Sequence, residues 1–173
     1  MILSKIWFLF FVLILFLTIV TFDSAQEKPV ALHYGGEVTP FYSKGFMTSL
    51  VEPALEDLGA IIVAPDCPSK GWTNAASKAA RHPDLFSAAI PISAPAAMST
   101  TPIIQDVPLY IIHGEKDELF PSLDVKLLYH KQKNNGAEIE MIIVAGVSHY
   151  QLARFITPLK ATIPWIRKIW ENR

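Results

Sequence analysis

The feature that most constrains the fold is a pair of short apolar runs, each followed by a loop that carries an ionisable side chain. The runs cover residues 109–112 and 139–144, and each is followed closely by glycine. Short apolar runs with these boundaries are typical of buried β-strands. Asp117 follows the first run and His149 follows the second. Because sites in open α/β sheets are assembled at the carboxyl ends of strands, we expect both side chains to belong to one site.

The rest of the chain alternates between strand and helix patterns. In residues 49–58 the apolar positions repeat at helical spacing, and Gly59 provides a stop signal. We expect further strands over residues 29–34, 60–64 and 85–92, and helices over 49–58, 75–81, 122–132 and from Thr157-Pro158 onward. Such alternation predicts an α/β fold with a mainly parallel sheet and helices on both faces.

Several motifs occur in a characteristic order. They are His33-Tyr34-Gly35-Gly36, the segment from Gly59 to Asp66, the segment from Ala80 to Phe86, His113-Gly114-Glu115-Lys116-Asp117 and Gly146-Val147-Ser148-His149. On these motifs, the chain from about residue 29 onward resembles the α/β-hydrolases of the esterase, dienelactone hydrolase and prolyl-oligopeptidase-like group. The resemblance implies the α/β-hydrolase fold and hydrolysis of ester or amide bonds through a triad in the order Ser, Asp, His.

The resemblance also implies a role for each matched residue. His149 would be the general base and acid, and Asp117 the carboxylate that orients its imidazole. The loop at Tyr34 and Gly35 would supply one oxyanion-hole donor, although Tyr34 replaces the first glycine of the family's turn. A small-molecule ester or peptide is the implied substrate, and no cofactor is implied.

The nucleophile segment of that family is missing from this chain. No G-x-S-x-G occurs, and only Ala75-Ala76-Ser77-Lys78 joins the segments that would flank it, so the domain is internally shortened near residues 74–79. In the family the nucleophile strand lies at the centre of the sheet. Its loss should bring the strand ending at His33 beside the strand ending at Ile92, and efficient serine-ester hydrolysis is not expected.

Three other side chains are candidates for a replacement nucleophile. Ser77 stands where the elbow serine would be, but its neighbours Ala76 and Lys78 favour a solvated helix. Ser93 is better placed at the carboxyl end of a strand, although it resembles a structural small residue. Cys67 has no adjacent base or cation to lower the pKa of its thiol. Ser93 and Ser77 remain weak candidates, and no nucleophile is identified.

The amino terminus has the pattern of a secretory signal peptide. A charged start is followed by an apolar run over residues 6–20 and by the small pair Ser24-Ala25. We therefore expect a leader over residues 1–25 and a secreted or periplasmic hydrolase-like domain over 26–173. The alternative is an uncleaved membrane anchor, because the apolar run approaches the ~18 residues that cross a bilayer.

Composition limits the remaining partners. The net charge of -1 does not indicate nucleic acid or an anionic membrane surface as a partner. Cys67 is the single cysteine, so no intramolecular disulfide can form. His113, Asp117 and His149 have no recognised metal-ligand spacing, so no metal is expected.

Two interpretations of function remain open. The first is a serine hydrolase whose nucleophile segment was lost through a gene-model error, a skipped exon or an internal deletion. The second is a non-catalytic secreted protein that keeps the α/β-hydrolase fold to bind a ligand or partner.

Overall fold

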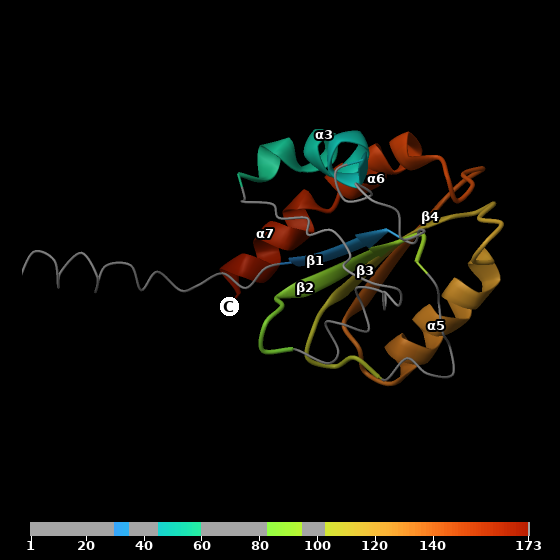
Figure 1. Ribbon diagram of the computed structural model, residues 1–173. Coiled ribbons are helices and arrows are strands. Elements are labelled where there is room, and N and C mark those ends of the chain that lie inside the picture. The colour runs from blue at the N-terminus through green and yellow to red at the C-terminus, as the bar shows by residue number, and fades with distance from the viewer. Residues whose placement is uncertain (1–29, 35–44, 60–82, 95–102, 173) are drawn as a thin grey trace, which may run out of the picture.

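The computed structural model describes residues 30–34, 45–59, 83–94 and 103–172. Within these residues a parallel sheet lies between two layers of helix (Figure 1). No helix in the described part of the chain combines the length and the apolar character needed to cross a membrane.

The sheet has four described strands in the order β1-β2-β3-β4, and each neighbouring pair is parallel. They are β1 (Val30–Tyr34), β2 (Ala88–Ile92), β3 (Leu109–Gly114) and β4 (Ile139–Val144). The predicted α/β fold with a mainly parallel sheet is therefore confirmed. The strand expected over residues 60–64 and the helix over 75–81 lie outside the described residues.

β1 pairs directly with β2 at one edge of the described sheet. The register runs from Val30 opposite Ala88 to Tyr34 opposite Ile92 without interruption. This is the neighbour relation expected for a chain that lacks the family's nucleophile strand. Buried backbone N–H and C=O groups need partners, and the two strands supply them to each other.

Two strand boundaries differ from the sequence-based expectation. β2 begins at Ala88 rather than at residue 85, because residues 83–85 form a turn and Leu85 is exposed. β3 continues to Gly114 because residues 113 and 114 still pair with Ile143 and Val144 of β4.

A helical segment beginning before the predicted residue 49 covers one face of the sheet. It comprises a π-helical turn η1 (Met47–Val51), α3 (Glu52–Leu55) and a 3-10 turn η2 (Glu56–Leu58). Gly59 ends it in the left-handed region at φ 73°, as its stop signal predicts. The buried residues of this segment, Leu50, Val51, Ala54 and Leu55, pack in one core with Ile90, Ile92 and Ile112 of the sheet.

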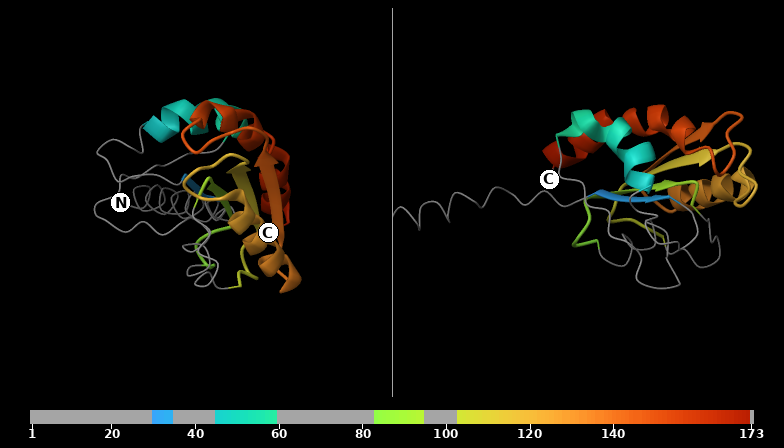
Figure 2. Two further views of the ribbon diagram at one scale, coloured as in Figure 1. Left: turned by 90° about the vertical axis from the view of Figure 1, so that its right-hand side faces the viewer. Right: turned by 45° about the horizontal axis from the view of Figure 1, so that its top comes forward.

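The carboxyl-terminal helices share that face. They are η3 (Leu152–Phe155), α6 (Ile156–Lys160) and α7 (Ile163–Glu171). α6 lies beside the segment of residues 45–59 in both views of Figure 2 and contacts α3.

The single final helix expected from Thr157-Pro158 is therefore interrupted. Pro164 has no N–H to donate to the preceding turn, so a continuous helix would lose a hydrogen bond there. The chain instead turns at Thr162, whose hydroxyl donates to the carbonyl of Leu159 at 2.7 Å. Leu159, Ile163 and Ile166 are nevertheless buried in the core, as their spacing predicts.

The opposite face is covered by α5 (Ser122–Asn134). Val125 of α5 packs against a second core cluster that contains Leu109 and Ile111 of β3. Ile112 faces the other core cluster, since successive side chains of a strand point to opposite faces. The helix gives way to a turn at Asn135 and Gly136, close to the predicted stop.

Candidate active site

Asp117 and His149 are in direct contact at the carboxyl edge of the sheet. The Nδ1–H of His149 donates to Oδ2 of Asp117 at 2.9 Å, and both side chains are fully buried. The other carboxylate oxygen, Oδ1, accepts the backbone N–H groups of Leu119 at 3.0 Å and Phe120 at 2.8 Å. The two oxygens of Asp117 are thus divided between its own loop and the imidazole.

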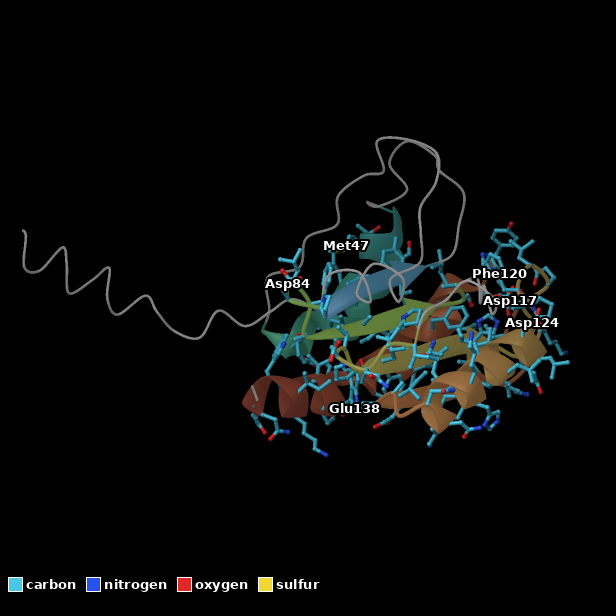
Figure 3. All side chains as sticks on the ribbon, turned by 90° about the horizontal axis from the view of Figure 1, so that it is seen from below. Met47, Asp84, Asp117, Phe120, Asp124 and Glu138 are labelled. Carbon is cyan, nitrogen blue, oxygen red and sulfur yellow. The ribbon has the colours of Figure 1, made fainter. Side chains whose placement is uncertain are left out.

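Figure 3 shows where this pair lies in the molecule. Asp117, Phe120 and Asp124 gather where β3 ends and α5 begins. Asp84, which precedes β2, lies toward the opposite end of the sheet. The pair therefore occupies the sheet edge at which α/β folds assemble their sites.

Hydrogen bonds join the loops that follow β3 and β4. Lys116 donates its N–H to the carbonyl of Val147 at 2.9 Å, and Oε2 of Glu115 accepts the N–H of Gly146 at 2.8 Å. Gly114 is required at this junction, because a Cβ there would overlap the carbonyl oxygen of Val147. This junction fixes the loop of His149 relative to the loop of Asp117.

Further contacts hold His149 itself. Its backbone N–H donates to Oε2 of Glu118 at 3.1 Å. The rings of Phe120 and Tyr150 meet its imidazole edge-on, with centroids 5.3 and 4.9 Å away. Position and orientation of the imidazole are therefore both constrained.

His113 is a buried member of the site to which the sequence analysis gave no catalytic role. Its Nε2 lies 2.8 Å from the carbonyl oxygen of Phe120. A carbonyl can only accept, so Nε2 carries a hydrogen. Burial lowers the pKa of His113 and favours the neutral ring, in which Nδ1 has no hydrogen. The available signal was its position four residues before Asp117, whose Oδ2 lies 3.7 Å from Nε2.

Ser93 directly follows β2. Its backbone N–H donates to the carbonyl of Ile112 at 2.9 Å, which places Ser93 opposite His113 in the parallel ladder. Ser93 is the one non-glycine residue with positive φ in the described part of the chain, at 41°. Its hydroxyl is buried without a hydrogen-bond partner among the described residues, and so is Nδ1 of His113.

The other sequence-predicted residues are not brought into this contact network by anything the structure describes. Tyr34 is the last residue of β1, and only its backbone is described. Gly35, Cys67, Ser77 and the proposed leader over 1–25 lie outside the described residues. Among the described residues no group of three or more His, Cys, Asp or Glu side chains is placed to hold a metal ion.

The Asp117–His149 arrangement is suited to proton transfer. With Nδ1–H directed at the carboxylate, Nε2 is the ring nitrogen that must accept a proton in any base chemistry. The carboxylate would then stabilise the imidazolium that forms. This is the division of roles that the acid and base of a catalytic triad require.

No protein-family model matches this sequence, and no curated protein matches it. Solved structures do match. An esterase of Pyrococcus furiosus aligns with a TM-score of 0.55 at 15% identity, covering 86% of this chain and 83% of that one. A hydrolase of the α/β superfamily from Xanthomonas campestris pv. campestris aligns at 0.53 and 18%, covering 82% and 98%.

An alpha-beta serine hydrolase homologue from Coxiella burnetii aligns with a TM-score of 0.51 at 14% identity, covering 83% of this chain and 85% of that one. At these identities the likeness establishes the fold, which is that of the α/β-hydrolases. The chain spans only 24%, 43% and 39% of three other similar esterase structures, which are a thermostable esterase, a truncated carbohydrate esterase from gut microbiota and esterase PE8.

Proposed function

We propose that this protein belongs to the serine-type hydrolases of ester or amide bonds, with Asp117 as the acid and His149 as the general base. The observation that carries the proposal is the 2.9 Å contact between Nδ1 of His149 and Oδ2 of Asp117 at the carboxyl edge of the sheet. A fold alone does not name a reaction. The orientation of a buried imidazole by a buried carboxylate supports this one.

In the proposed reaction a nucleophilic oxygen attacks the carbonyl carbon of the substrate. His149 accepts the proton of the nucleophile at Nε2 and then donates it to the leaving group, while Asp117 stabilises the imidazolium. Water then attacks the carbonyl carbon of the acyl intermediate while His149 accepts a proton from it. His149 returns that proton to the oxygen of the nucleophile, and the acid product is released. The reaction needs no redox change and no group beyond these side chains and water.

Ser93 is the nucleophile that we propose within the described chain. Its positive φ is a backbone strain of the kind stored at functional sites, and its hydroxyl has no competing partner in the described structure. It directly follows β2, which lies between β1 and β3 in the described sheet. Ser93 is therefore not at the margin of that sheet. Ser93 and His149 are both fully buried, so a substrate that reaches either side chain must displace what covers it.

The test is covalent labelling with a fluorophosphonate probe, read by intact mass and peptide mapping. We expect a single adduct on Ser93 that is lost in Ser93→Ala and in His149→Ala, with circular dichroism showing that each variant is folded. An adduct on Ser77 that depends on His149 would support the hydrolase but move its nucleophile. A folded wild-type protein that forms no adduct would refute the hydrolase proposal for this chain.

That last outcome would favour the second function, a non-catalytic binding protein with this fold. The observations in its favour are the missing G-x-S-x-G and the complete burial of His149. The nucleic acid between the codons for Asn74 and Ala79 discriminates between the two functions. A segment coding for G-x-S-x-G at that point would exclude the binding protein.

A further inference from the structure

Phe120 is the residue at which three contacts of the site meet. Its carbonyl accepts the Nε2–H of His113 at 2.8 Å, and its own N–H donates to Oδ1 of Asp117 at 2.8 Å. Its ring packs edge-on against the imidazole of His149, with a centroid distance of 5.3 Å. The position of Phe120 therefore affects both the acid and the base.

His113 connects Phe120 to the rigid part of the fold. It lies in β3, which is paired on both sides: Ser93 bonds to the carbonyl of Ile112, and His113 itself pairs with Ile143 of β4. Phe120 lies in the loop between β3 and α5. The His113 side chain thus fixes a loop carbonyl against a strand that packing holds in place.

The charge of His113 is compatible with this role. Burial lowers the pKa of His113, so the ring is neutral near neutral pH. A protonated ring at this place would compete with His149 for Oδ2 of Asp117, which lies 3.7 Å from Nε2. A neutral ring donates to Phe120 and leaves the carboxylate to His149.

We propose that His113 is a positioning residue for the Asp117–His149 pair, acting through Phe120. Its catalytic consequence rests on the hydrolase function proposed above, but its effect on His149 does not. Removing the Nε2 donor frees the Phe120 carbonyl, which loosens the N–H that holds Oδ1 and the ring that packs on the imidazole.

The test compares His113→Leu with His113→Gln by ¹⁵N and ¹H magnetic resonance of the His149 ring. Leucine fills the volume without a donor, whereas the amide nitrogen of glutamine can donate near the Nε2 position. We expect His113→Leu to weaken or remove the Nδ1–H resonance of His149. His113→Gln should restore that resonance.

The matched control is Gln132→Leu in α5. It removes a buried hydrogen bond in which the N–H of Ile104 donates to Oε1 of Gln132 at 2.9 Å. It should lower the stability and leave the His149 resonances unchanged. If His113→Leu does not fold, His113→Asn, whose shorter amide cannot reach Phe120, takes its place. A wild-type Nδ1–H resonance of His149 in folded His113→Leu or folded His113→Asn would overturn the proposal.

Labelling with the fluorophosphonate probe gives the second readout. We expect His113→Leu to slow labelling by on the order of a hundredfold, the cost of misplacing a catalytic group by about 1 Å. If wild-type protein is not labelled, the hydrolase proposal fails while the resonance experiment still decides the role of His113. The two failures are therefore distinguishable.

Discussion

Asp117 divides its carboxylate between two kinds of partner. Oδ1 accepts backbone N–H groups of its own loop, and Oδ2 accepts the imidazole N–H of His149. An amide in its place can serve only one of these sides, because its nitrogen donates and cannot accept. A single substitution can therefore separate the contact of Asp117 with His149 from its contacts with its own loop.

Asp117→Asn should keep the loop contacts and lose the correct orientation of His149. We expect the imidazole to change to the Nε2–H tautomer, visible by ¹⁵N magnetic resonance, and probe labelling to slow by up to about 10⁴-fold. Asp124→Asn, at an exposed acid in the first turn of α5, is the matched control. An unchanged tautomer and labelling rate in Asp117→Asn would contradict the assignment of the acid.

Gly114→Ala should disturb the junction between the two site loops. The new Cβ would overlap the carbonyl of Val147, which is backbone and cannot rotate away. We expect a loss of about 1–3 kcal/mol in the free energy of unfolding, measured by urea denaturation. Gly45→Ala is the control, because a Cβ there meets nothing within 4 Å. Equal stability of the two variants would show that the junction adapts without cost.

The burial of His113 should make stability depend on pH. Its folded-state pKa is lowered by burial, so below about 6.5, the ordinary value, the unfolded chain binds a proton that the folded protein does not. The free energy of unfolding should therefore decrease as pH falls through that value. Urea denaturation across this range should show a weaker decrease in His113→Gln, and an identical decrease in both proteins would argue against a neutral buried ring.

At the scale of elements, alternation within each strand assigns side chains to two separate cores. Ile90, Ile92 and Ile112 pack toward α3, α6 and α7, while Leu109 and Ile111 pack toward α5. The carboxyl-terminal helices contribute to the larger of these clusters, although they are interrupted at Thr162. Their value to the fold therefore comes from burial rather than from helix length.

Leu159→Ala in α6 should expose this dependence. Leu159 is completely buried, and truncating such a leucine costs about 2–5 kcal/mol through lost burial and a residual cavity. Leu127→Ala in α5 is the matched control, because Leu127 is 49% exposed and its loss should change stability by less than about 0.5 kcal/mol. A small effect of Leu159→Ala in chemical denaturation would mean that the α6 layer is not part of the cooperative fold.

At the scale of the whole molecule, the sheet joins segments that are distant in sequence. β1 (Val30–Tyr34) is the direct neighbour of β2 (Ala88–Ile92), and helices cover both faces of the strands that follow. The strands with two paired neighbours are β2 and β3 in the described sheet. Both should therefore form the most stable part of the molecule.

Hydrogen exchange tests that expectation. The amides of β3 should exchange only when the whole domain unfolds, because the strand is paired on both sides and covered on both faces. Amides near Asn134 at the exposed end of α5 should exchange much faster. Equal rates in both places would indicate that the four-stranded sheet is not a cooperative unit.

Sequence patterns were sufficient to predict the alternation of strands and helices. They also predicted that Asp117 and His149 lie in the loops after successive strands. The sequence also predicted the residues of β4 (Ile139–Val144) and the approximate end of α5 near Gly136. These features are readable because hydrophobic periodicity and turn residues act over a few neighbouring positions.

The contacts between those elements arise from tertiary packing and could not be read from the sequence. The 2.9 Å bond between His149 and Asp117 joins loops that are distant in sequence. The link from His113 to Phe120 and the positive φ of Ser93 follow no local sequence pattern. The lowered pKa of His113 likewise depends on its burial in the folded protein. Local patterns place a side chain on an element, but its partners, and hence its chemistry, are set when the elements pack together.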